Sequence, residues 1–301
     1  MSVLMPVSVL SIAGSDPSGG AGLQADLKTF QQFGVYGMSA VTLLTVQNTV
    51  GVSAVEMIRA EFVCQQIDAV LDDIPPQAVK IGALGSSELV QVVSDRLLNH
   101  PSQVLRSAPV VVDPVMVSKH GHSLVADEFV HAFSNQIVPL ATVITPNRFE
   151  AERLTGTKIL KPNDAELAAQ RIVSMGAKFA LVKFGQANES YAVAIAADGY
   201  STLLNQPFIP SNSTHGTGCI LSAIVAAKLA CLSQTRIETN WDSICEIVDG
   251  AMIQLGRALQ FSSPFGRGIR PLKRESFEPK TEPANKIDRS PASLSARKLA
   301  L

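Results

Sequence analysis

The chain alternates short, continuously apolar segments with longer segments whose apolar residues recur at helical spacing. The short segments end at Gly, Asp, Pro or Asn, and they cover residues 7–13, 40–46, 78–81, 109–112, 141–144, 177–182 and 191–196. The helical segments include residues 23–33, 60–71, 88–98, 150–155 and 165–175. Strands that are apolar throughout are buried on both faces, and intervening helices supply the crossovers between parallel neighbours. The alternation therefore predicts an α/β fold with a mostly parallel central sheet, helices on both faces, and functional groups at the carboxyl ends of the strands.

Length and composition restrict the class of protein further. The chain has 301 residues, 46% of them hydrophobic, which is enough to bury a sizeable core, and we expect residues 1–273 to form one domain. A net charge of -1 and an aromatic content of 5% argue against a nucleic-acid-binding surface. The sequence lacks the long apolar run of a membrane span. Its four cysteines form no CxxC pair, so we expect no zinc site, no disulfide framework and a cytoplasmic location.

Residues 274–301 differ from the rest of the chain in composition. They contain three prolines and many charged side chains, with few large apolar residues. Such a segment buries too little apolar surface to offset its loss of conformational entropy. We therefore expect a flexible C-terminal tail, and a short helix near the end that binds a partner is the less favoured alternative.

A glycine-rich loop follows the first apolar segment, in the sequence Ala13-Gly-Ser-Asp-Pro-Ser-Gly-Gly-Ala-Gly22. Glycines let the backbone approach a ligand closely, so Gly14 is a candidate ligand contact. Asp26 lies on the helix that follows and is a candidate hydrogen-bond partner for a polar substrate. The loop is neither a P-loop nor a GxGxxG motif. The alternative is an ordinary strand-to-helix turn.

A second glycine-rich segment, Thr214-His-Gly-Thr-Gly-Cys219, opens a helix that is apolar almost all round and therefore buried. The amides of Gly216, Thr217, Gly218 and Cys219 would converge on an anion at the positive end of the helix dipole. The same dipole is expected to lower the pKa of the Cys219 thiol, which would then serve as a base or nucleophile. The alternative is a small buried cysteine that only packs.

Polar side chains also follow two later apolar segments. Asp113 ends residues 109–112, where a carboxylate could organise Mg²⁺ and its water shell, although an Asp-Pro turn would also end a strand. Asn147 and Glu150 follow residues 141–144. They match a helix capping box, and they could also order water on Mg²⁺ and phosphate.

Two lysines are candidate phosphate contacts. Lys119 lies in a polar stretch, Lys119-His-Gly-His122, that could close over a site and exclude water. The two histidines of that stretch have no evident third partner, so a solvated loop is favoured over a metal site. Lys183 ends another apolar segment and could face a nucleotide, with a surface lysine as an equal alternative.

Taken in order, these motifs resemble the ribokinase-like superfamily, and more closely the hydroxymethylpyrimidine/phosphomethylpyrimidine kinases of thiamine biosynthesis. Besides the two glycine-rich segments, the resemblance rests on Gln24-Ala-Asp-Leu-Lys28, Thr45-Val-Gln-Asn-Thr49, Val79-Lys-Ile-Gly82, Val112-Asp-Pro-Val-Met-Val117, and Thr145-Pro-Asn147 with Glu150. It covers roughly residues 7–260 and implies a three-layer sandwich that transfers phosphate from ATP to a small alcohol.

The resemblance also implies roles for individual residues. Gln47 would bind the pyrimidine edge, where an amide supplies both a donor and an acceptor. Gly14 and Asp26 would lie beside the substrate, and Asn147, Lys183, Thr217 and Lys119 would contact the nucleotide. Asp113 and Glu150 would arrange Mg²⁺. Gly216 and Gly218 would form the anion hole, and Cys219 would occupy the position of the catalytic base.

The sequence departs from the family pattern at a few positions. Ala83 stands where methionine is common, and Phe184 begins a segment that is usually Gly-Gly-His. Segment 265–270 matches the family's C-terminal glycine-rich end only in part. We expect a homodimer by resemblance alone.

Two other functions remain open. The first is a pyridoxal kinase, which is modestly disfavoured because Ser118 stands in place of a lid cysteine. The second is a non-catalytic pyrimidine-binding regulatory protein.

Overall fold

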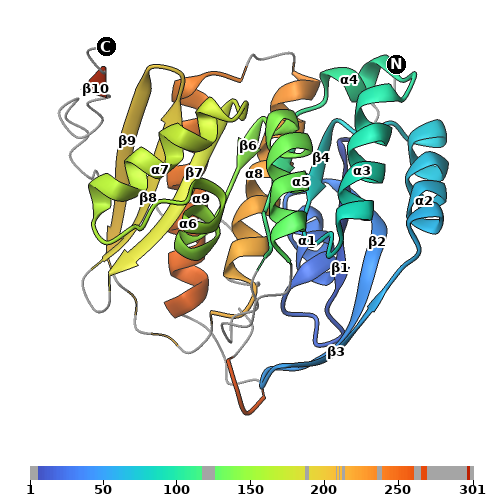
Figure 1. Ribbon diagram of the computed structural model, residues 1–301, viewed down its shortest axis with the longest axis horizontal. Coiled ribbons are helices and arrows are strands. Elements are labelled where there is room, and N and C mark those ends of the chain that lie inside the picture. The colour runs from blue at the N-terminus through green and yellow to red at the C-terminus, as the bar shows by residue number, and fades with distance from the viewer. Residues whose placement is uncertain are drawn as a thin grey trace.

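The computed structural model describes residues 6–116, 126–186, 190–207, 209, 211, 214–235, 239–260, 266–269 and 297–298. Within them, ten strands form one sheet in the order β10-β9-β8-β7-β6-β5-β4-β1-β2-β3. The six central strands are parallel: β1 (Ser8–Ser15), β2 (Tyr36–Gln47), β4 (Ala78–Ile81), β5 (Val110–Val112), β6 (Val143–Ile144) and β7 (Phe179–Gln186). The prediction of a mostly parallel central sheet is therefore confirmed (Figure 1).

Both edges of the sheet are antiparallel. β3 (Val52–Met57) pairs with β2, while β8 (Ser190–Ala197) and β9 (Tyr200–Pro207) continue from β7. The connections between these strands are short, and a short connection permits only an antiparallel hairpin. The sequence did not indicate β3, because Ser53 and Glu56 interrupt its apolar residues, and five of its six residues are exposed.

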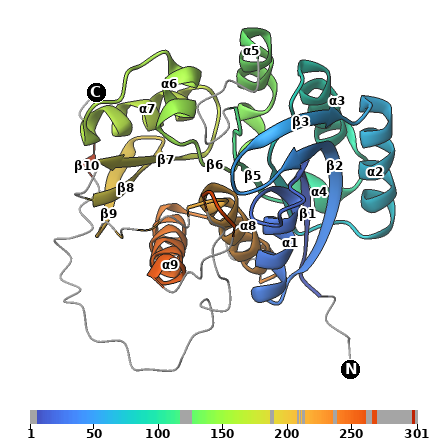
Figure 2. The same ribbon diagram turned by 90° about the horizontal axis from the view of Figure 1, so that it is seen from below.

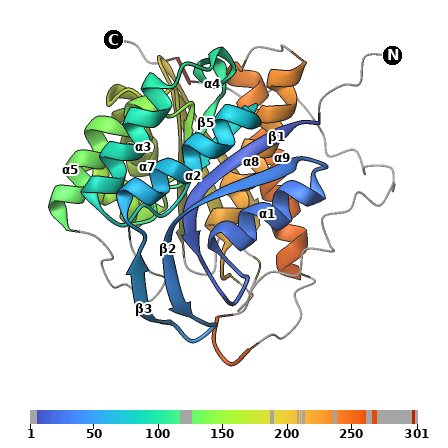
Figure 3. The same ribbon diagram turned by 90° about the vertical axis from the view of Figure 1, so that its right-hand side faces the viewer.

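Two layers of helices cover the sheet (Figures 2 and 3). On one face lie α2 (Ala60–Asp73), α3 (Ser87–Asn99), α4 (Gln103–Ser107), α5 (Asp127–Gln136), α6 (Arg148–Thr155) and α7 (Pro162–Ser174). On the other face lie α1 (Gly22–Gln32), α8 (Thr217–Gln234) and α9 (Trp241–Gln260). Successive residues of a strand face opposite sides, so Val9 belongs to the hydrophobic core on the side of α1, α8 and α9, while Leu10 belongs to the core on the other side. The expected three-layer sandwich is confirmed.

Helix α8 lies against the middle of the sheet, where it contacts β4, β5 and β1. Its length and mean hydropathy of 1.5 would suit a membrane span, but 56% of that stretch is buried inside the protein. It is therefore a core helix, as its all-round apolar sequence predicted. Its first turn reaches the edge of the sheet where the parallel strands end, and this places the second glycine-rich segment beside the first.

The predicted tail is described only at Arg297–Lys298, which form β10 and pair with Tyr200 and Ser201 at the edge of the sheet. The remaining residues of 274–301 lie outside the described part of the chain. The division into residues 1–273 and a flexible tail stays a prediction.

Candidate active site

A cavity of about 1090 Å³ lies at the carboxyl ends of the parallel strands. The loop after β1, the end of β2, the residues that follow β4, β5 and β6, and the first turn of α8 all contribute to it. Most of the residues singled out in the sequence line this one cavity: Gly14, Gln47, Asp113, Asn147, Glu150, Lys183, Gly216, Thr217, Gly218 and Cys219. The strand order alone brings these distant segments together, because parallel strands end at the same edge.

The two glycine-rich segments are packed directly against each other. Gly216, the residue before α8, has φ +78°, and a Cβ there would overlap the carbonyl oxygen of Gly20. Gly22 has φ +55°, and a Cβ there would overlap the carbonyl oxygen of Gly14. L-residues rarely adopt such φ values, and here the missing side chains also make room for neighbouring backbone. The glycines thus shape one continuous backbone wall beside the first amides of α8.

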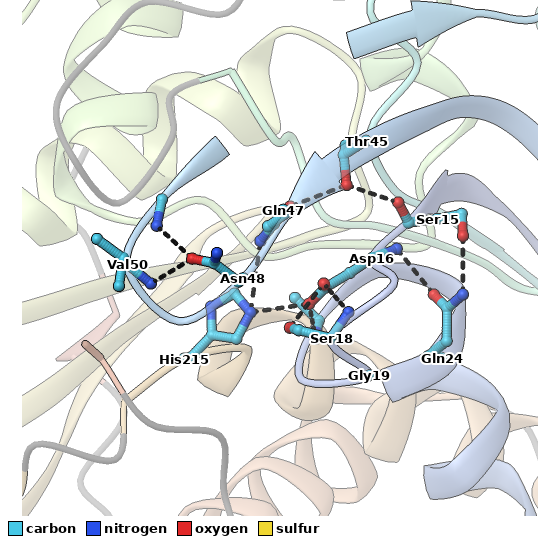
Figure 4. A network of polar contacts seen from close by, with 12 residues as sticks. Ser15, Asp16, Ser18, Gly19, Gln24, Thr45, Gln47, Asn48, Val50 and His215 are labelled. Atoms are coloured by element: carbon cyan, nitrogen blue, oxygen red, sulfur yellow. Dashed lines mark hydrogen bonds and ion pairs between the residues drawn. The ribbon is translucent and has the colours of Figure 1, made fainter. Parts of the chain in front are cut away.

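Asp16 and His215 join these two segments through their side chains (Figure 4). His215 Nε2 lies 2.8 Å from Asp16 Oδ2, and the amide nitrogen of Gln47 lies 3.4 Å from the same ring nitrogen. Asp16 also accepts hydrogen bonds from the backbone and hydroxyl of Ser18 and from the backbone of Ala21. Both residues line the cavity, although the sequence argument gave them no role. The signals that could have identified them were a carboxylate in the loop after β1 and a histidine within the second glycine-rich segment.

These contacts make the stability of the protein depend on the ionisation of Asp16. Burial alone would raise the pKa of Asp16, but hydrogen bonds from His215 and Ser18 outweigh it and lower the pKa below its ordinary 3.8. A carboxyl group whose pKa is lowered by folding stabilises the protein at pH values above its pKa in the unfolded chain. This stabilisation disappears as the pH falls through the pKa of the same group in the folded protein. We therefore expect Asp16→Asn to destabilise the protein by about 1–3 kcal/mol at pH 7 and to flatten its acid unfolding curve. Urea unfolding at several pH values measures both effects.

The exposed carboxylate Asp198 provides the control for that prediction. Asp198→Asn should leave the free energy of unfolding within about 0.5 kcal/mol of the original. Equal acid profiles for Asp16→Asn and Asp198→Asn would contradict the proposed contribution of the Asp16 network.

An ion pair lies beside the first turn of α8, next to Gly218. Lys183 Nζ is 3.3 Å from Asp113 Oδ1, and the Thr145 hydroxyl donates to the same oxygen. Both members of the pair are buried, so Lys183 is not the surface lysine of the alternative interpretation. Burial by itself would raise the pKa of Asp113, but Lys183 and Lys80 hold it below its ordinary value. A Cβ at Gly218 would lie 3.2 Å from Lys183 Nζ, so this helix turn passes directly beside the ion pair.

Asn147 and Glu150 form the capping box that their spacing predicted. Glu150 N donates to Asn147 Oδ1 at 3.0 Å, and Asn147 N donates to Glu150 Oε2 at 2.8 Å. The pKa of Glu150 is raised to about 8. Burial is the largest cause, Lys183 opposes it, and nearby Asp113 acts in the same direction as burial. The helix-capping interpretation is thus correct. It is compatible with a second role, because both side chains also line the cavity.

Cys219 contradicts one expectation from the sequence. Its position in the first turn of α8 was expected to lower the thiol pKa, but burial raises it to about 12. Lys80 and the backbone N–H of Gly22 favour the thiolate, while Asp113 and Asp26 oppose it. Desolvation outweighs the favourable contacts because the charged form loses its hydration inside the protein. The ligand-free site therefore holds a neutral thiol.

Asp26 also differs from its predicted place. Its side chain is fully buried below the cavity, where Oδ2 lies 2.8 Å from Lys80 Nζ and accepts from the Ser11 hydroxyl. The apolar face of α1 packs on the sheet, and this orientation turns Asp26 inward. Lys80, which the sequence argument left without a role, lines the cavity instead. Asp26 outweighs the effect of burial and holds the pKa of Lys80 above its ordinary value.

Some predicted contacts lie beyond the described part of the chain, including Lys119, His120, His122 and Ser118. Among the residues that are described, no group of three or more His, Cys, Asp or Glu side chains could hold a metal ion by itself. Mg²⁺ commonly takes only one or two carboxylates and completes its shell with water and phosphate oxygens. The pair Asp113 and Glu150 fits that pattern. All four cysteines are free.

Comparison with known proteins agrees with this geometry. A family model described as phosphomethylpyrimidine kinase matches residues 16–243. The hydroxymethylpyrimidine/phosphomethylpyrimidine kinase of Bacillus subtilis is 38% identical over 271 residues, which cover 89% of this chain and 95% of that protein. Among solved structures, the phosphomethylpyrimidine kinase of Clostridium difficile has a TM-score of 0.69 at 37% identity, over 83% of this chain and 97% of that one. The pyridoxal kinase of Staphylococcus aureus in complex with ADP has a TM-score of 0.80 at 29% identity, over 92% and 96%.

The three-layer fold, with its cavity at the carboxyl ends of the strands, and these neighbours define the class: the protein is an enzyme, a small-molecule kinase with the ribokinase-like fold. Within that class, two findings identify the family: the family model matches residues 16–243, and the sequence is 38% identical to a curated relative. The chain belongs to the phosphomethylpyrimidine kinase family.

Proposed function

We propose that this protein transfers the γ-phosphoryl group of ATP to 4-amino-5-hydroxymethyl-2-methylpyrimidine, and a second one to the resulting monophosphate, as in thiamine biosynthesis. The observation that carries the proposal is the common cavity. It holds a glycine-lined helix N-terminus, a buried Asp113–Lys183 pair and the Gln47 amide. Phosphoryl transfer needs mainly positioning and neutralisation of charge, and these groups are suited to both.

The phosphate groups would lie between α8 and the Asp113–Lys183 pair. The first amides of α8, beside Gly216 and Gly218, supply backbone donors at the positive end of a long helix. Lys183 adds a full positive charge beside the Gly218 backbone. Thr217 and Asn147 line the same region and supply neutral polar contacts. This arrangement stabilises the negative charge that develops on the β,γ-bridging oxygen as its bond to the γ-phosphorus breaks and ADP leaves.

Asp113 and Glu150 would hold Mg²⁺ by their carboxylate oxygens. Mg²⁺ held there would supply positive charge that offsets the repulsion between phosphate oxygens. Deprotonated Glu150 is required for this role, and its raised pKa of about 8 keeps it largely protonated at neutral pH without a cation. A divalent cation beside the two carboxylates would favour the ionised form of Glu150.

The pyrimidine would bind at the other end of the cavity, beside Gln47 and Gly14. Gln47 offers a donor and an acceptor to an aminopyrimidine edge, and the Asp16–His215 pair fixes the backbone that faces it. A Cβ at Gly14 would come within 2.6 Å of the Leu43 side chain, so this wall has no space for a larger residue. Asp26 acts through Lys80 and does not touch the substrate in this proposal.

Cys219 would accept the proton of the substrate hydroxyl. In a loose transition state this proton leaves late, so the acceptor does not have to generate a free alkoxide. Because the thiol pKa is about 12 in the ligand-free protein, the proton acceptor is a minor ionised form. Lys80 favours that form by charge, from its fixed place beside Asp26.

A comparison of three candidate substrates tests the proposal. Purified protein with Mg-ATP is offered hydroxymethylpyrimidine, its monophosphate and pyridoxal separately, and ADP release is followed. We expect the highest kcat/KM on the two pyrimidines, by at least about tenfold over pyridoxal. Faster turnover on pyridoxal would reverse this order, and no turnover on any of the three would favour the non-catalytic binding protein.

Pyridoxal kinase remains the second candidate, because pyridoxal kinases are among the solved structures with TM-scores of 0.77 to 0.80. The curated relatives and the family model favour the pyrimidine instead.

We also propose a cytoplasmic location, consistent with four free cysteines, and a homodimer. Light scattering should then give about twice the chain mass of 32.0 kDa.

A further inference from the structure

A short segment near the C-terminus, residues 266–269, lies against the turn between β2 and β3 (Figure 1). The segment has the sequence Gly-Arg-Gly-Ile and falls outside the region that matches the family model. Its last residue, Ile269, lines the cavity together with Thr49 and Gln47. The segment therefore adds a wall to the site from a part of the chain that the family match leaves out.

The contact with the turn is made by backbone. Ile269 N donates to the carbonyl oxygen of Thr49 at 2.8 Å, and Gly268 N donates to the Thr49 hydroxyl at 3.2 Å. A Cβ at Gly268 would overlap that carbonyl oxygen, and a Cβ at Gly266 would overlap the Thr49 side chain. Only glycine allows the two backbones to approach this closely, so the Gly-Arg-Gly spacing is explained by the contact itself.

The turn that receives the segment is otherwise closed by hydrogen bonds of its own, among them Asn48 N to the carbonyl oxygen of Gly51 at 3.0 Å. Asn48 Oδ1 accepts from the backbone of Val50 and Gly51, which closes the turn on itself. The neighbouring residues project into solvent, and Val46 and Val50 are 62% and 55% exposed. Gln47 comes immediately before Asn48, so the turn holds its backbone, while Thr45 and His215 contact its side-chain amide.

We propose that residues 266–269 are a positioning segment that fixes the 48–51 turn, and through it Gln47, and so sets the affinity of the site for its pyrimidine. The inference rests on the proposed function. The segment supplies no group to phosphoryl transfer, because its described contacts are with the turn and none is with Asp113, Lys183 or Cys219. Its loss should therefore weaken pyrimidine binding and leave ATP binding unchanged.

The test compares Gly268→Ala with Gly250→Ala. Gly250 lies in α9, and a Cβ there would meet nothing within 4 Å, so this control changes the same residue type without a new contact. We expect Gly268→Ala to raise KM for the pyrimidine about tenfold or more, with kcat and KM for ATP within about threefold of the original. A change in kcat or in both KM values alike, or no change in any of them, would overturn the proposal.

A milder variant guards against misfolding. Thr49→Val keeps the shape of the side chain and removes only the acceptor for Gly268 N, so the rise in pyrimidine KM should be smaller, about two- to fivefold. Hydrogen exchange in the ligand-free protein supplies a readout that needs no activity. The amides of Val50 and Gly51 should exchange faster in Gly268→Ala than in Gly250→Ala.

These readouts separate this inference from the proposed function. Unchanged exchange at the turn would overturn the inference even if the pyrimidine is the substrate. If the pyrimidine is not phosphorylated and pyridoxal is, the proposed function fails, and the same split between KM values is then measured on pyridoxal. Faster exchange without any rise in the KM of the accepted substrate would also overturn the inference.

Discussion

Replacing Cys219 with alanine is expected to lower kcat by about 10²- to 10⁴-fold, because the substrate hydroxyl loses its proton acceptor. Binding should survive, since the thiol supplies neither the phosphate contacts nor the pyrimidine contacts proposed above. Thermal stabilisation by Mg-ATP and by the pyrimidine should therefore remain close to that of the original protein. ADP release measures the first quantity and thermal unfolding with each ligand measures the second.

Cys231 on the same helix provides the matched control. It is also a free, partly buried cysteine, but it does not line the cavity, so Cys231→Ala should keep its activity. Turnover by Cys219→Ala close to that of Cys231→Ala would remove the thiol from the mechanism. Because burial raises the pKa of the Cys219 thiol to about 12, its ionised fraction grows with pH across the neutral range. We expect kcat/KM to rise with it, and the residual activity of Cys219→Ala to lose this rise.

Gly216→Ala is expected to damage both stability and activity. The φ of +78° costs an L-residue about 1–2 kcal/mol, and the new Cβ would overlap the Gly20 carbonyl, which lies in the first glycine-rich loop. Displacement of that loop adds the cost of overpacking, about 1–3 kcal/mol. It also moves the first amides of α8, so we expect kcat to fall by about a hundredfold or more. Urea unfolding and ADP release measure the two effects.

Gly34 separates the effect of φ from the effect of the contact. It has φ +67°, but a Cβ there would meet nothing within 4 Å. Gly34→Ala should therefore lose only about 1–2 kcal/mol of stability and retain its kcat. If Gly216→Ala behaved like Gly34→Ala in activity, close packing of the two glycine-rich segments would have no part in catalysis.

The sequence predicted the central fold well and the edges poorly. Apolar strands buried on both faces, such as β1 and β4, leave a continuous signal, and α8 was correctly expected to be buried because it is apolar all round. β3 and β9 were missed because strands at or next to the edge of the sheet have fewer buried neighbours, and their residues show no clear apolar alternation. The segments that line the cavity were identified because glycine and polar residues directly follow strands.

Individual roles inside the site were predicted less completely. Spacing identified the capping box of Asn147 and Glu150, because that motif is local. The ion pairs Lys80–Asp26 and Lys183–Asp113 join residues 54 and 70 positions apart, and nothing local reveals such partners. Asp26 was placed beside the substrate for this reason, whereas the packing of α1 turns it into the core.

The residue types and their order along the chain determined the fold class, the family resemblance and the edge of the sheet where the site lies. These follow from local patterns, since hydrophobic periodicity and glycine placement act within a few residues. Only the tertiary structure decided which of these residues are neutral, charged or paired. The Cys219 pKa illustrates the reason: the helix dipole can be read from sequence, but the desolvation that outweighs it depends on every segment packed around the thiol.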